Sequence, residues 1–307
     1  MPDQTSFHED APAKVNLTLA VTGRRTDGYH LLDSMVVFAG ICDHISLRPS
    51  PTDHLELTGP FASAVGSTPP RENSVWQSLT TFRDATGWDQ SFTITLDKNL
   101  PVAAGIGGGS SDAAAMLRLL NRLAPDPLSD EMLDHLALDL GADVPVCLRA
   151  KRGGLWRMRG IGELLEPLPA IQNPAQNPGL VLFNNGTRVA TKDVFAAFSK
   201  TGGVKPGRPD DVSSDMPPSS GPIRITDLGS LIADGNDLLK PAIHVAPGIK
   251  QSLDILASMH SARGFIASGM SGSGATCFAL FTDPDTAVSA LNSLGETEGW
   301  CWAGGIR

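Results

Sequence analysis

The feature that most constrains this chain is a glycine-rich stretch that leads straight into a helix. Residues 100–115 have the sequence Leu-Pro-Val-Ala-Ala-Gly-Ile-Gly-Gly-Gly-Ser-Ser-Asp-Ala-Ala-Ala. Glycine has no Cβ and adopts positive φ readily, so this backbone can turn several N–H groups inward. Ser110, Ser111 and Asp112 are good N-cap residues, and the alanines after them favour a helix. We therefore expect a loop that ends at a capped helix N-terminus, with Asp112 as a helix-cap acid.

Such a loop has the properties of a phosphate-binding site. The unpaired N–H groups and the positive end of the helix dipole favour an anion. The alternative is a flexible turn, but three consecutive glycines before a helix favour phosphate. The loop is not a Walker motif, because no lysine ends it, and Ser110 stands where a dinucleotide fingerprint has its third glycine. Any catalytic charge must therefore come from elsewhere in the chain.

Composition limits the class of protein. A length of 307 residues predicts two domains, and 41% hydrophobic with 19% charged residues is typical of a globular protein. The net charge of −9 argues against a nucleic-acid partner or an anionic membrane surface, but it leaves a small anionic substrate possible. The N-terminus is polar, without the pattern of a targeting peptide, and no apolar run reaches membrane-spanning length. We expect a cytoplasmic protein.

The four cysteines predict free thiols in a reducing compartment. They are Cys42, Cys147, Cys277 and Cys301, and they form no C-x-x-C pair. A zinc site is not expected, and no dedicated metal cluster is apparent.

The first strand carries two polar candidates. Apolar residues alternate from 13 to 21, which predicts a strand with Lys14 and Asn16 on the face opposite the apolar one. The pattern alone favours a solvated surface lysine at Lys14. Asp27 and Gly28 then predict a turn into a second strand, 31–41. Tyr29, beside His30, could stack on a base or cover the hairpin, and both interpretations stay open.

The remaining chain alternates further strands and helices. Asp143, two residues before Pro145, is expected to be partly buried, as a helix N-cap or as a catalytic residue. A second glycine loop, 269–275, is either a tight hairpin or a surface that approaches a ligand closely. Residues 201–222 predict a mobile insertion. The second half suits a small antiparallel sheet with helices on one face. The expected helices are 73–86, the segment after residue 109, 130–140, 191–200, 247–262 and 283–294; the expected strands are 43–58 with a break at Pro49–Pro51, 91–96, 179–183, 264–268, 276–281 and 300–306.

Three stretches, taken together, resemble the motifs of the GHMP small-molecule kinases. They are residues 12–17 with 25–30, residues 101–115, and residues 271–276. The resemblance covers nearly the whole chain. The Lys-x-Asn-Leu and Asp-Gly-Tyr-His segments, with Gly141–Pro145, narrow it to the branch acting on 4-diphosphocytidyl-2-C-methyl-D-erythritol, in the non-mevalonate isoprenoid pathway.

The resemblance implies a fold and a reaction. The fold is α+β, with an N-terminal domain (1–165) like the second domain of ribosomal protein S5 and a ferredoxin-like C-terminal domain (166–307). ATP, with Mg²⁺, is the phosphoryl donor, and the acceptor is the 2-hydroxyl of a small cytidine-diphosphate substrate. Oligomeric state stays open between monomer and homodimer. The implied site residues are Lys14 and Asp143 for catalysis; Pro101, Val102, Ala103, Ala104, Gly105, Ile106, Gly107, Gly108, Gly109, Ser110 and Ser111 for ATP; and Asn16, Tyr29, His30 and Phe195 for substrate.

Three other functions stay open. Another GHMP kinase would act on a sugar, homoserine or a mevalonate derivative. A non-catalytic ATP-binding module is disfavoured by the presence of both Lys14 and Asp143. An NAD-dependent oxidoreductase is disfavoured by the missing third glycine.

Overall fold

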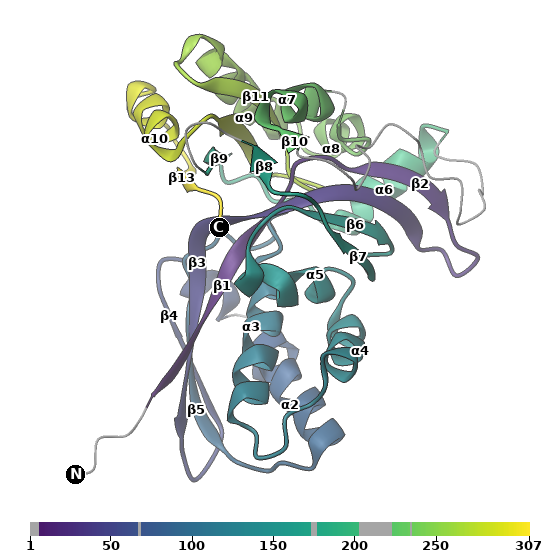
Figure 1. Cartoon of the computed structure of the whole chain (residues 1–307), viewed down its shortest axis with the longest axis vertical. Coiled ribbons are helices and arrows are strands. Elements are labelled where there is room, and N and C mark those ends of the chain that lie inside the picture. The colour runs from purple at the N-terminus through teal and green to yellow at the C-terminus, as the bar shows by residue number, and fades with distance from the viewer. Residues whose placement is uncertain (1–5, 67–68, 173–176, 203–222, 234) are drawn as a thin grey trace. The chain divides into compact units, whose positions relative to one another are not determined.

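The structure is a computed structural model that describes residues 6–66, 69–172, 177–202, 223–233 and 235–307 (Figure 1). Its chain divides into two compact units made of alternating segments. Unit 1 comprises Met1–Ala13, Ile41–Val102 and Gly107–Lys151; unit 2 comprises Lys14–Gly40, Ala103–Ile106 and Arg152–Arg307. The boundary expected between residues 165 and 166 stays a prediction, because the units follow contacts and not sequence order. The expected insertion at 201–222 lies, from residue 203 on, outside the described residues.

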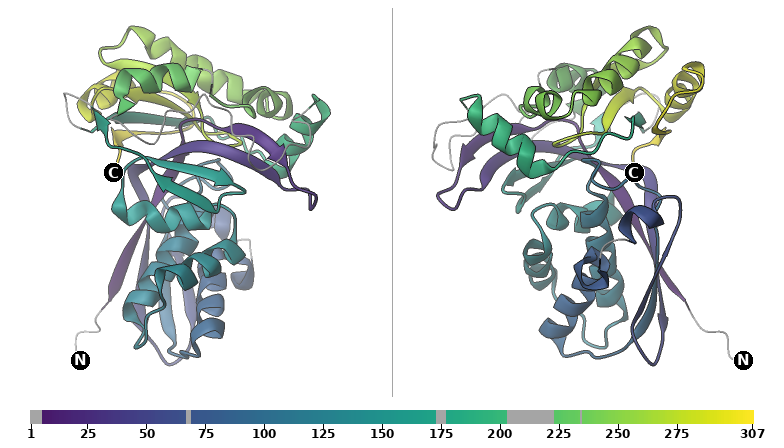
Figure 2. Two further views of the ribbon diagram at one scale, coloured as in Figure 1. Left: turned by 45° about the vertical axis from the view of Figure 1, so that its right-hand side comes forward. Right: turned by 180° about the vertical axis from the view of Figure 1, so that it is seen from behind.

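Unit 1 combines strands with a group of helices. β5 (Phe92–Asp97) pairs antiparallel with the second half of β3 (His30–Pro49) and parallel with β4 (His54–Thr58). Phe92, Ile94 and Leu96 alternate with polar residues, and this face of β5 is buried. Helices α2 to α5 pack on one another and cover one face of these strands (Figure 2). The helical elements are α1 (Ala62–Val65), η1 (Pro70–Glu72), α2 (Ser74–Thr86), α3 (Gly108–Leu123), α4 (Asp130–Leu140), α5 (Val144–Leu148) and η2 (Arg149–Arg152).

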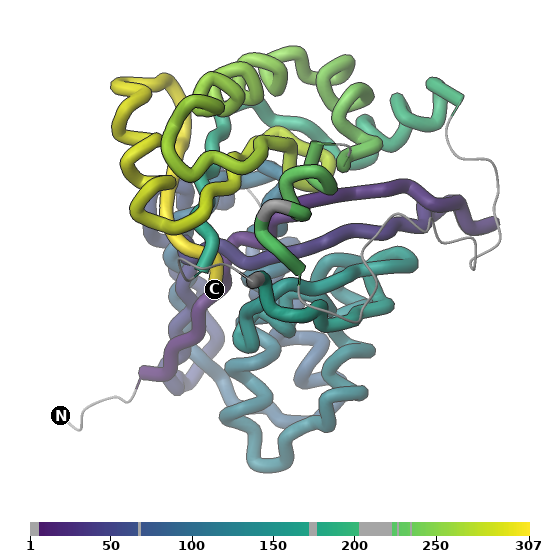
Figure 3. Tube along the Cα trace, turned by 45° about the horizontal axis from the view of Figure 1, so that its top comes forward, coloured from purple at the N-terminus to yellow at the C-terminus, as the bar shows by residue number. Residues whose placement is uncertain are grey.

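Unit 2 contains a long ribbon and a four-stranded sheet. β2 (Ala20–Arg24) runs antiparallel beside the first half of β3, which also pairs with β6 (Trp156–Gly160), and β6 pairs with β7 (Leu164–Pro167) (Figure 3). The second sheet has the order β11-β12-β9-β13 and is antiparallel throughout, as the sequence predicts. Its strands are β9 (Gly179–Asn184), β11 (Phe265–Met270), β12 (Cys277–Phe281) and β13 (Trp300–Gly305).

Helices cover this second sheet. Residues of α8, α9 and α10 join β9 and β12 in one hydrophobic core, in which Phe183, Phe281 and Ile249 are fully buried. The short pair β8–β10 lies outside that sheet. The remaining elements are α6 (Thr191–Lys200), α7 (Ile225–Ala233), α8 (Leu239–Val245), α9 (Gly248–Ala257), η3 (Ser258–Ser261), α10 (Pro284–Ser293), β8 (Ile171–Gln172) and β10 (Ile223–Arg224).

The first predicted strand is two strands. β1 (Phe7–Asn16) ends before residue 17, and β2 begins at Ala20. Between them the Leu19 amide donates to the Gly235 carbonyl. Both faces of β1 are buried from Ala11 onward, so the expectation of a solvated Lys14 is wrong: the residue is 3% exposed.

Candidate phosphate-binding and active site

The N-terminus of α3 presents backbone donors that the helix itself does not pair. Gly107, at a φ of 63°, is the N-cap, and no side chain caps this end. The first helical hydrogen bond runs from the Ser111 amide to the Gly107 carbonyl at 2.8 Å. The amides of the three residues between them therefore have no carbonyl partner within the helix. With the dipole of a 16-residue helix behind them, these amides have the properties of the anion site that the glycine run predicts, which stays a prediction.

The predicted capping residues have other roles. The Ser111 hydroxyl is buried, donates to the Pro12 carbonyl at 2.7 Å and lies 3.4 Å from the Cys147 sulfur. Asp112 is also buried and pairs with Lys98, so its assignment as a helix-cap acid is wrong. The helix begins two residues earlier than the serines because glycine, and not a hydroxyl, makes the turn. Ser110 is half-buried.

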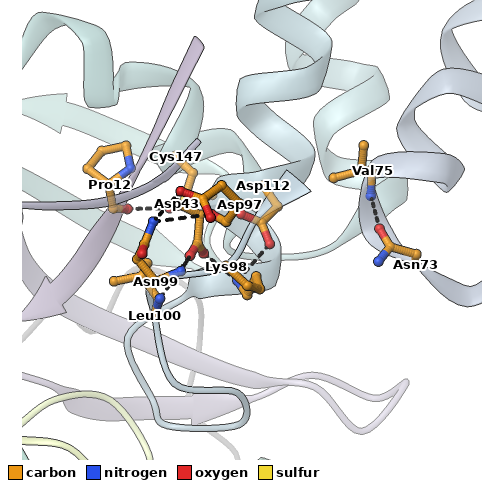
Figure 4. A network of polar contacts seen from close by, with 11 residues as sticks. Pro12, Asp43, Asn73, Val75, Asp97, Lys98, Asn99, Leu100, Asp112 and Cys147 are labelled. Atoms are coloured by element: carbon orange, nitrogen blue, oxygen red, sulfur yellow. Dashed lines mark hydrogen bonds and ion pairs between the residues drawn. The ribbon is translucent and has the colours of Figure 1, made fainter. Parts of the chain in front are cut away.

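Beneath this helix end lies a buried cluster of three charged side chains, which we call the ion triad: Lys98, Asp43 and Asp112 (Figure 4). The Lys98 ammonium pairs with one Asp43 oxygen and, at 2.8 Å, with Asp112 Oδ2. The other Asp43 oxygen accepts the amides of Asn99 at 2.6 Å and Leu100 at 2.8 Å. The triad thus ties the entry of the glycine loop to the helix at its exit.

Burial and ion pairing shift the pKa values of two members of the triad, Lys98 and Asp112. Burial alone would lower the pKa of Lys98, but the neighbouring Asp112 and Asp43 carboxylates outweigh it and hold that pKa above its usual value. Burial raises the pKa of Asp112 to about 7, against the opposing pull of Lys98.

In unit 2 the first glycine loop is held by the second. Gly105 has a φ of 75°, and a Cβ on it would lie 2.3 Å from the Gly274 carbonyl oxygen. The Ala104 carbonyl accepts the Thr276 amide at 2.9 Å. The second loop joins β11 to β12, which pair as a hairpin, so the hairpin interpretation is confirmed. The second loop also packs against residues 103–106 of the first loop.

The end of β1 reaches the same place. The Lys14 amide donates to the Ile106 carbonyl at 2.9 Å. The Asn16 amide donates to the Ser271 hydroxyl at 3.1 Å, which in turn donates to the Gly105 carbonyl at 3.0 Å. The Asn16 side-chain nitrogen donates to Ser34 at 2.7 Å, while its Oδ1 is buried without a partner among the described residues. That oxygen can accept a hydrogen bond from a ligand.

Two supporting residues were not identified from the sequence. Ser271 lies in the second glycine loop, but the local sequence does not indicate its hydrogen bonds with Asn16 and Gly105. Asn236 donates from its Nδ2 to the carbonyls of Met270 and Gly272, both at 2.8 Å. Their partners are distant in the chain, so no local pattern could have indicated them.

Asp143 is half-buried and directly precedes α5. It occupies the N-cap position of α5, as the sequence predicts, although its side chain makes no cap hydrogen bond. Asp143 belongs to unit 1, whereas Lys14 belongs to unit 2.

Two of the predicted substrate-binding residues, Tyr29 and His30, lie at the turn between β2 and β3. The ring of His30 stacks on Phe195 of α6 at 4.7 Å, and Phe198 meets it edge-on at 6.1 Å. Burial and then the charge of Arg24 lower the pKa of His30, which favours the neutral ring. Tyr29 is 58% exposed. The structure therefore brings His30 and Phe195 together and leaves the tyrosine ring open to solvent.

The sequence matches two protein-family models. They are the GHMP kinase N-terminal domain, over residues 73–151, and the GHMP kinase C-terminal domain, over residues 224–298. The chain belongs to the GHMP kinases. The α+β fold expected from the motifs is thereby confirmed. Within the described parts of this GHMP kinase, no helix is long and apolar enough to cross a membrane.

Two relatives of this GHMP kinase and one solved structure are named for the same activity. The 4-diphosphocytidyl-2-C-methyl-D-erythritol kinase of Granulibacter bethesdensis is 44% identical over 302 residues, which cover 96% of this chain and 93% of the relative. That of Paramagnetospirillum magneticum is 44% identical, covering 97% of each chain. A crystal structure of 4-(cytidine 5'-diphospho)-2C-methyl-D-erythritol kinase is 33% identical, has a TM-score of 0.70 and covers 98% of this chain and 99% of that one.

Proposed function

We propose that this GHMP kinase transfers the γ-phosphoryl group of ATP to the 2-hydroxyl of 4-diphosphocytidyl-2-C-methyl-D-erythritol, in the non-mevalonate route to isoprenoid precursors. The relatives of that name, aligned over nearly the full length of both chains, support the substrate. The observation that carries phosphoryl transfer is the uncapped N-terminus of α3 after the glycine loop. Both the cytoplasmic location and the choice between monomer and homodimer remain predictions.

The glycine loop binds the ATP phosphates in this proposal. Residues 101–111 surround the phosphates, the Gly108, Gly109 and Ser110 amides at the start of α3 donate to them, and the α3 dipole adds a favourable field for negative charge. Phosphoryl transfer depends on positioning and on charge neutralisation more than on covalent chemistry. A fixed backbone nest provides both without moving during the reaction.

Mg²⁺ enters as part of the MgATP substrate. Among the described residues there is no group of three or more His, Cys, Asp or Glu side chains that could hold a metal ion. In this proposal phosphate oxygens and water hold the Mg²⁺, the usual arrangement for a nucleotide complex. The ion neutralises phosphate charge, while the chain supplies the backbone donors.

Asp143 and Lys14 are the proposed catalytic pair. Asp143 accepts the proton of the 2-hydroxyl as transfer proceeds, and the Lys14 ammonium stabilises that carboxylate or the transferring group. In the structure Lys14 is buried, with its backbone bonded to the glycine loop. The Asp143 carboxylate is not used as a helix cap.

The cytidine end is proposed to lie at the β2–β3 turn. Tyr29 offers an exposed ring for stacking on the base, and the stacked pair of His30 and Phe195 forms a second aromatic surface. The unpartnered Asn16 Oδ1 provides an acceptor for a hydroxyl or amino group of the substrate.

The test is ADP release with purified protein and MgATP. We expect turnover with 4-diphosphocytidyl-2-C-methyl-D-erythritol and none with 2-C-methyl-D-erythritol that lacks the cytidine diphosphate. Turnover with homoserine, mevalonate or galactose in its place would assign the chain to another GHMP branch. Binding of ATP without turnover of any alcohol would support a non-catalytic module, and binding of NAD in place of ATP would support an oxidoreductase.

Asp143→Ala tests the base. We expect turnover to fall by about 10²–10⁴-fold, the usual contribution of a positioned base, while MgATP binding persists. Single-turnover kinetics and nucleotide titration measure the two effects. Near-normal turnover would remove Asp143 from the mechanism.

Tyr29→Ala tests stacking. Because the ring is exposed, its removal leaves the fold intact, and we expect the KM of the cytidylated substrate to rise by about tenfold with little change in the KM of ATP. Equal increases in both KM values would contradict a stacking role. Removal of the exposed Met132 side chain, on α4, is the matched control.

A further inference from the structure

The ion triad has more carboxylate than it can neutralise. Lys98, Asp43 and Asp112 are each at most 3% exposed, and one ammonium serves two carboxyl groups. With all three ionised, the cluster would bury a net charge of −1. Burying an uncompensated charge is strongly unfavourable, and replacing a buried ion pair with apolar residues is often neutral for stability. Stability alone therefore does not explain the triad.

One oxygen of the triad has no partner. Asp43 uses both oxygens, one for Lys98 and the other for two backbone amides. Asp112 uses Oδ2 for Lys98, while its Oδ1 is buried with no hydrogen-bond partner among the described residues. An ionised carboxylate is poorly accommodated there, whereas a proton on Oδ1 removes the excess charge. Asp112 is thus the member at which a proton is gained or lost.

The triad touches the proposed phosphate site. A Cβ on Gly108, the first residue of α3, would lie 3.3 Å from the Lys98 ammonium and 3.8 Å from an Asp43 carboxylate oxygen. Negative charge brought to the backbone amides at this helix end therefore acts on the triad at short range in a dry environment.

Uncharged groups of two neighbouring helices make hydrogen bonds close to Asp112. Against α3, α2 places the Ser78 hydroxyl on the Ala113 carbonyl and α5 places the Cys147 thiol by Ser111. The charged groups that act on Asp112 are Lys98, from the segment after β5, and Asp43, from β3, and burial raises the pKa of Asp112 to about 7.

We propose that Lys98, Asp43 and Asp112 position the phosphate-binding turn, and that Asp112 takes up a proton at Oδ1 when nucleotide phosphate binds at the N-terminus of α3. The proposal rests on the proposed function only in taking this helix end as the nucleotide site. By linkage, the nucleotide binds more tightly when the proton is already present. The contacts of Asp43 with Lys98 and with the Asn99 and Leu100 amides keep the loop entry fixed in both states.

The test is calorimetric titration with MgADP, which binds without turnover. Measured near pH 7.5 in two buffers of different ionisation enthalpy, binding to the wild-type protein should be accompanied by uptake of a substantial fraction of one proton. Between pH 6.5 and 8.5 the Kd should rise by about fivefold more than in Asp112→Asn, which has a similar shape and no proton to gain. Because the same ligand is used, its own titration cancels in the comparison.

A matched control is Asp53→Asn. Asp53 forms a two-pronged ion pair with Arg83 in the same unit, so this variant also neutralises one member of a partly buried pair. We expect it to lower stability and to keep the wild-type proton uptake. If Asp112→Asn fails to fold, infrared difference spectra of the wild-type protein should show a protonated-carboxyl band growing when MgADP binds.

The outcomes separate the two proposals. MgADP binding with the same proton uptake and pH dependence in wild type and Asp112→Asn would overturn the inference and leave the kinase standing. An infrared spectrum without a new protonated carboxyl would do the same. Failure of the wild-type protein to bind MgADP would overturn both.

Discussion

The two glycine loops are supported in different ways. The first loop, where it enters α3 in unit 1, is held by the ion triad, three charged side chains sealed from water. The second loop, in unit 2, is held by neutral groups: Ser271 and Asn236 make hydrogen bonds, and the Gly274 backbone lies tight against Gly105. Charged support responds to protons, whereas close backbone contact tolerates no added atom.

We expect the largest effect from a substitution that disrupts the close contact between Gly105 and Gly274. In Gly105→Ala the new methyl group would lie 2.3 Å from the Gly274 carbonyl oxygen and 2.8 Å from that of Ser271, at a positive φ. Backbone cannot yield as a flexible side chain does, so we expect a loss of about 3 kcal/mol or more in unfolding free energy, and at least about a hundredfold loss in kcat/KM.

The control for this variant is Gly186→Ala. Gly186 also has a positive φ, 86°, but a Cβ there would meet nothing within 4 Å. It should lose only about 1 kcal/mol, from backbone strain, and retain activity. Equal stabilities for the two variants, measured by urea unfolding, would show that the contact between the loops is not close.

The next effect concerns the charged support. Because the pKa of Asp112 is raised from 3.8 to about 7, the folded protein holds an extra proton between these values. Its contribution to stability is complete below about pH 4 and is lost as pH rises through 7, by up to about 1.4 kcal/mol per pH unit. Asp112→Asn should lack this part of the slope. Unfolding free energies at pH 5, 6, 7 and 8 measure it, and parallel profiles for the two proteins would contradict it.

The smallest effect concerns the neutral support. Ser271→Ala leaves the Asn16 amide and the Gly105 carbonyl without their partner, and we expect a loss of about 1–2 kcal/mol that does not vary between pH 5 and 8. Ser252→Ala is the matched control, because the Ser252 hydroxyl is buried without a partner among the described residues. That variant should be neutral or more stable. A pH-dependent loss in Ser271→Ala would erase the contrast between the loops.

Local sequence signals predicted most elements. α2 follows the Asn73 cap, α4 runs between the Ser129 cap and Gly141, and α6 has the predicted bounds, 191–200. The start signals of α2 and α4 are the capping residues directly before each helix, and Gly141 directly follows α4. The glycine run likewise identified the helix end that is proposed to bind phosphate.

The burial of both faces of β1 could not be predicted from the sequence. Alternation along β1 assigned Lys14 and Asn16 to a solvent face, but both are nearly inaccessible because each face of the strand is covered. A period of two separates the faces of a strand without saying what lies against either. Only the resemblance to the GHMP kinases pointed to these two residues.

The ion pairs of the triad could not be predicted from the sequence either, because their members are far apart in the chain. Asp43, Lys98 and Asp112 are separated by 55 and 14 residues, and each by itself fits a surface position or a cap. Asp112 was assigned to a cap because acids are common near helix starts. Its ion pair with Lys98 depends on tertiary structure, about which helix propensity carries no information.

The alternating segments of the two units have a consequence for inheritance. The chain passes between units after residues 13, 40, 102, 106 and 151, and the single strand β3 serves both. A gene crossover between two relatives at any point from 14 to 151 would give a hybrid in which at least one unit has mixed parentage. Such hybrids inherit mismatched cores, so these enzymes should diverge as whole genes and not by exchange of domains.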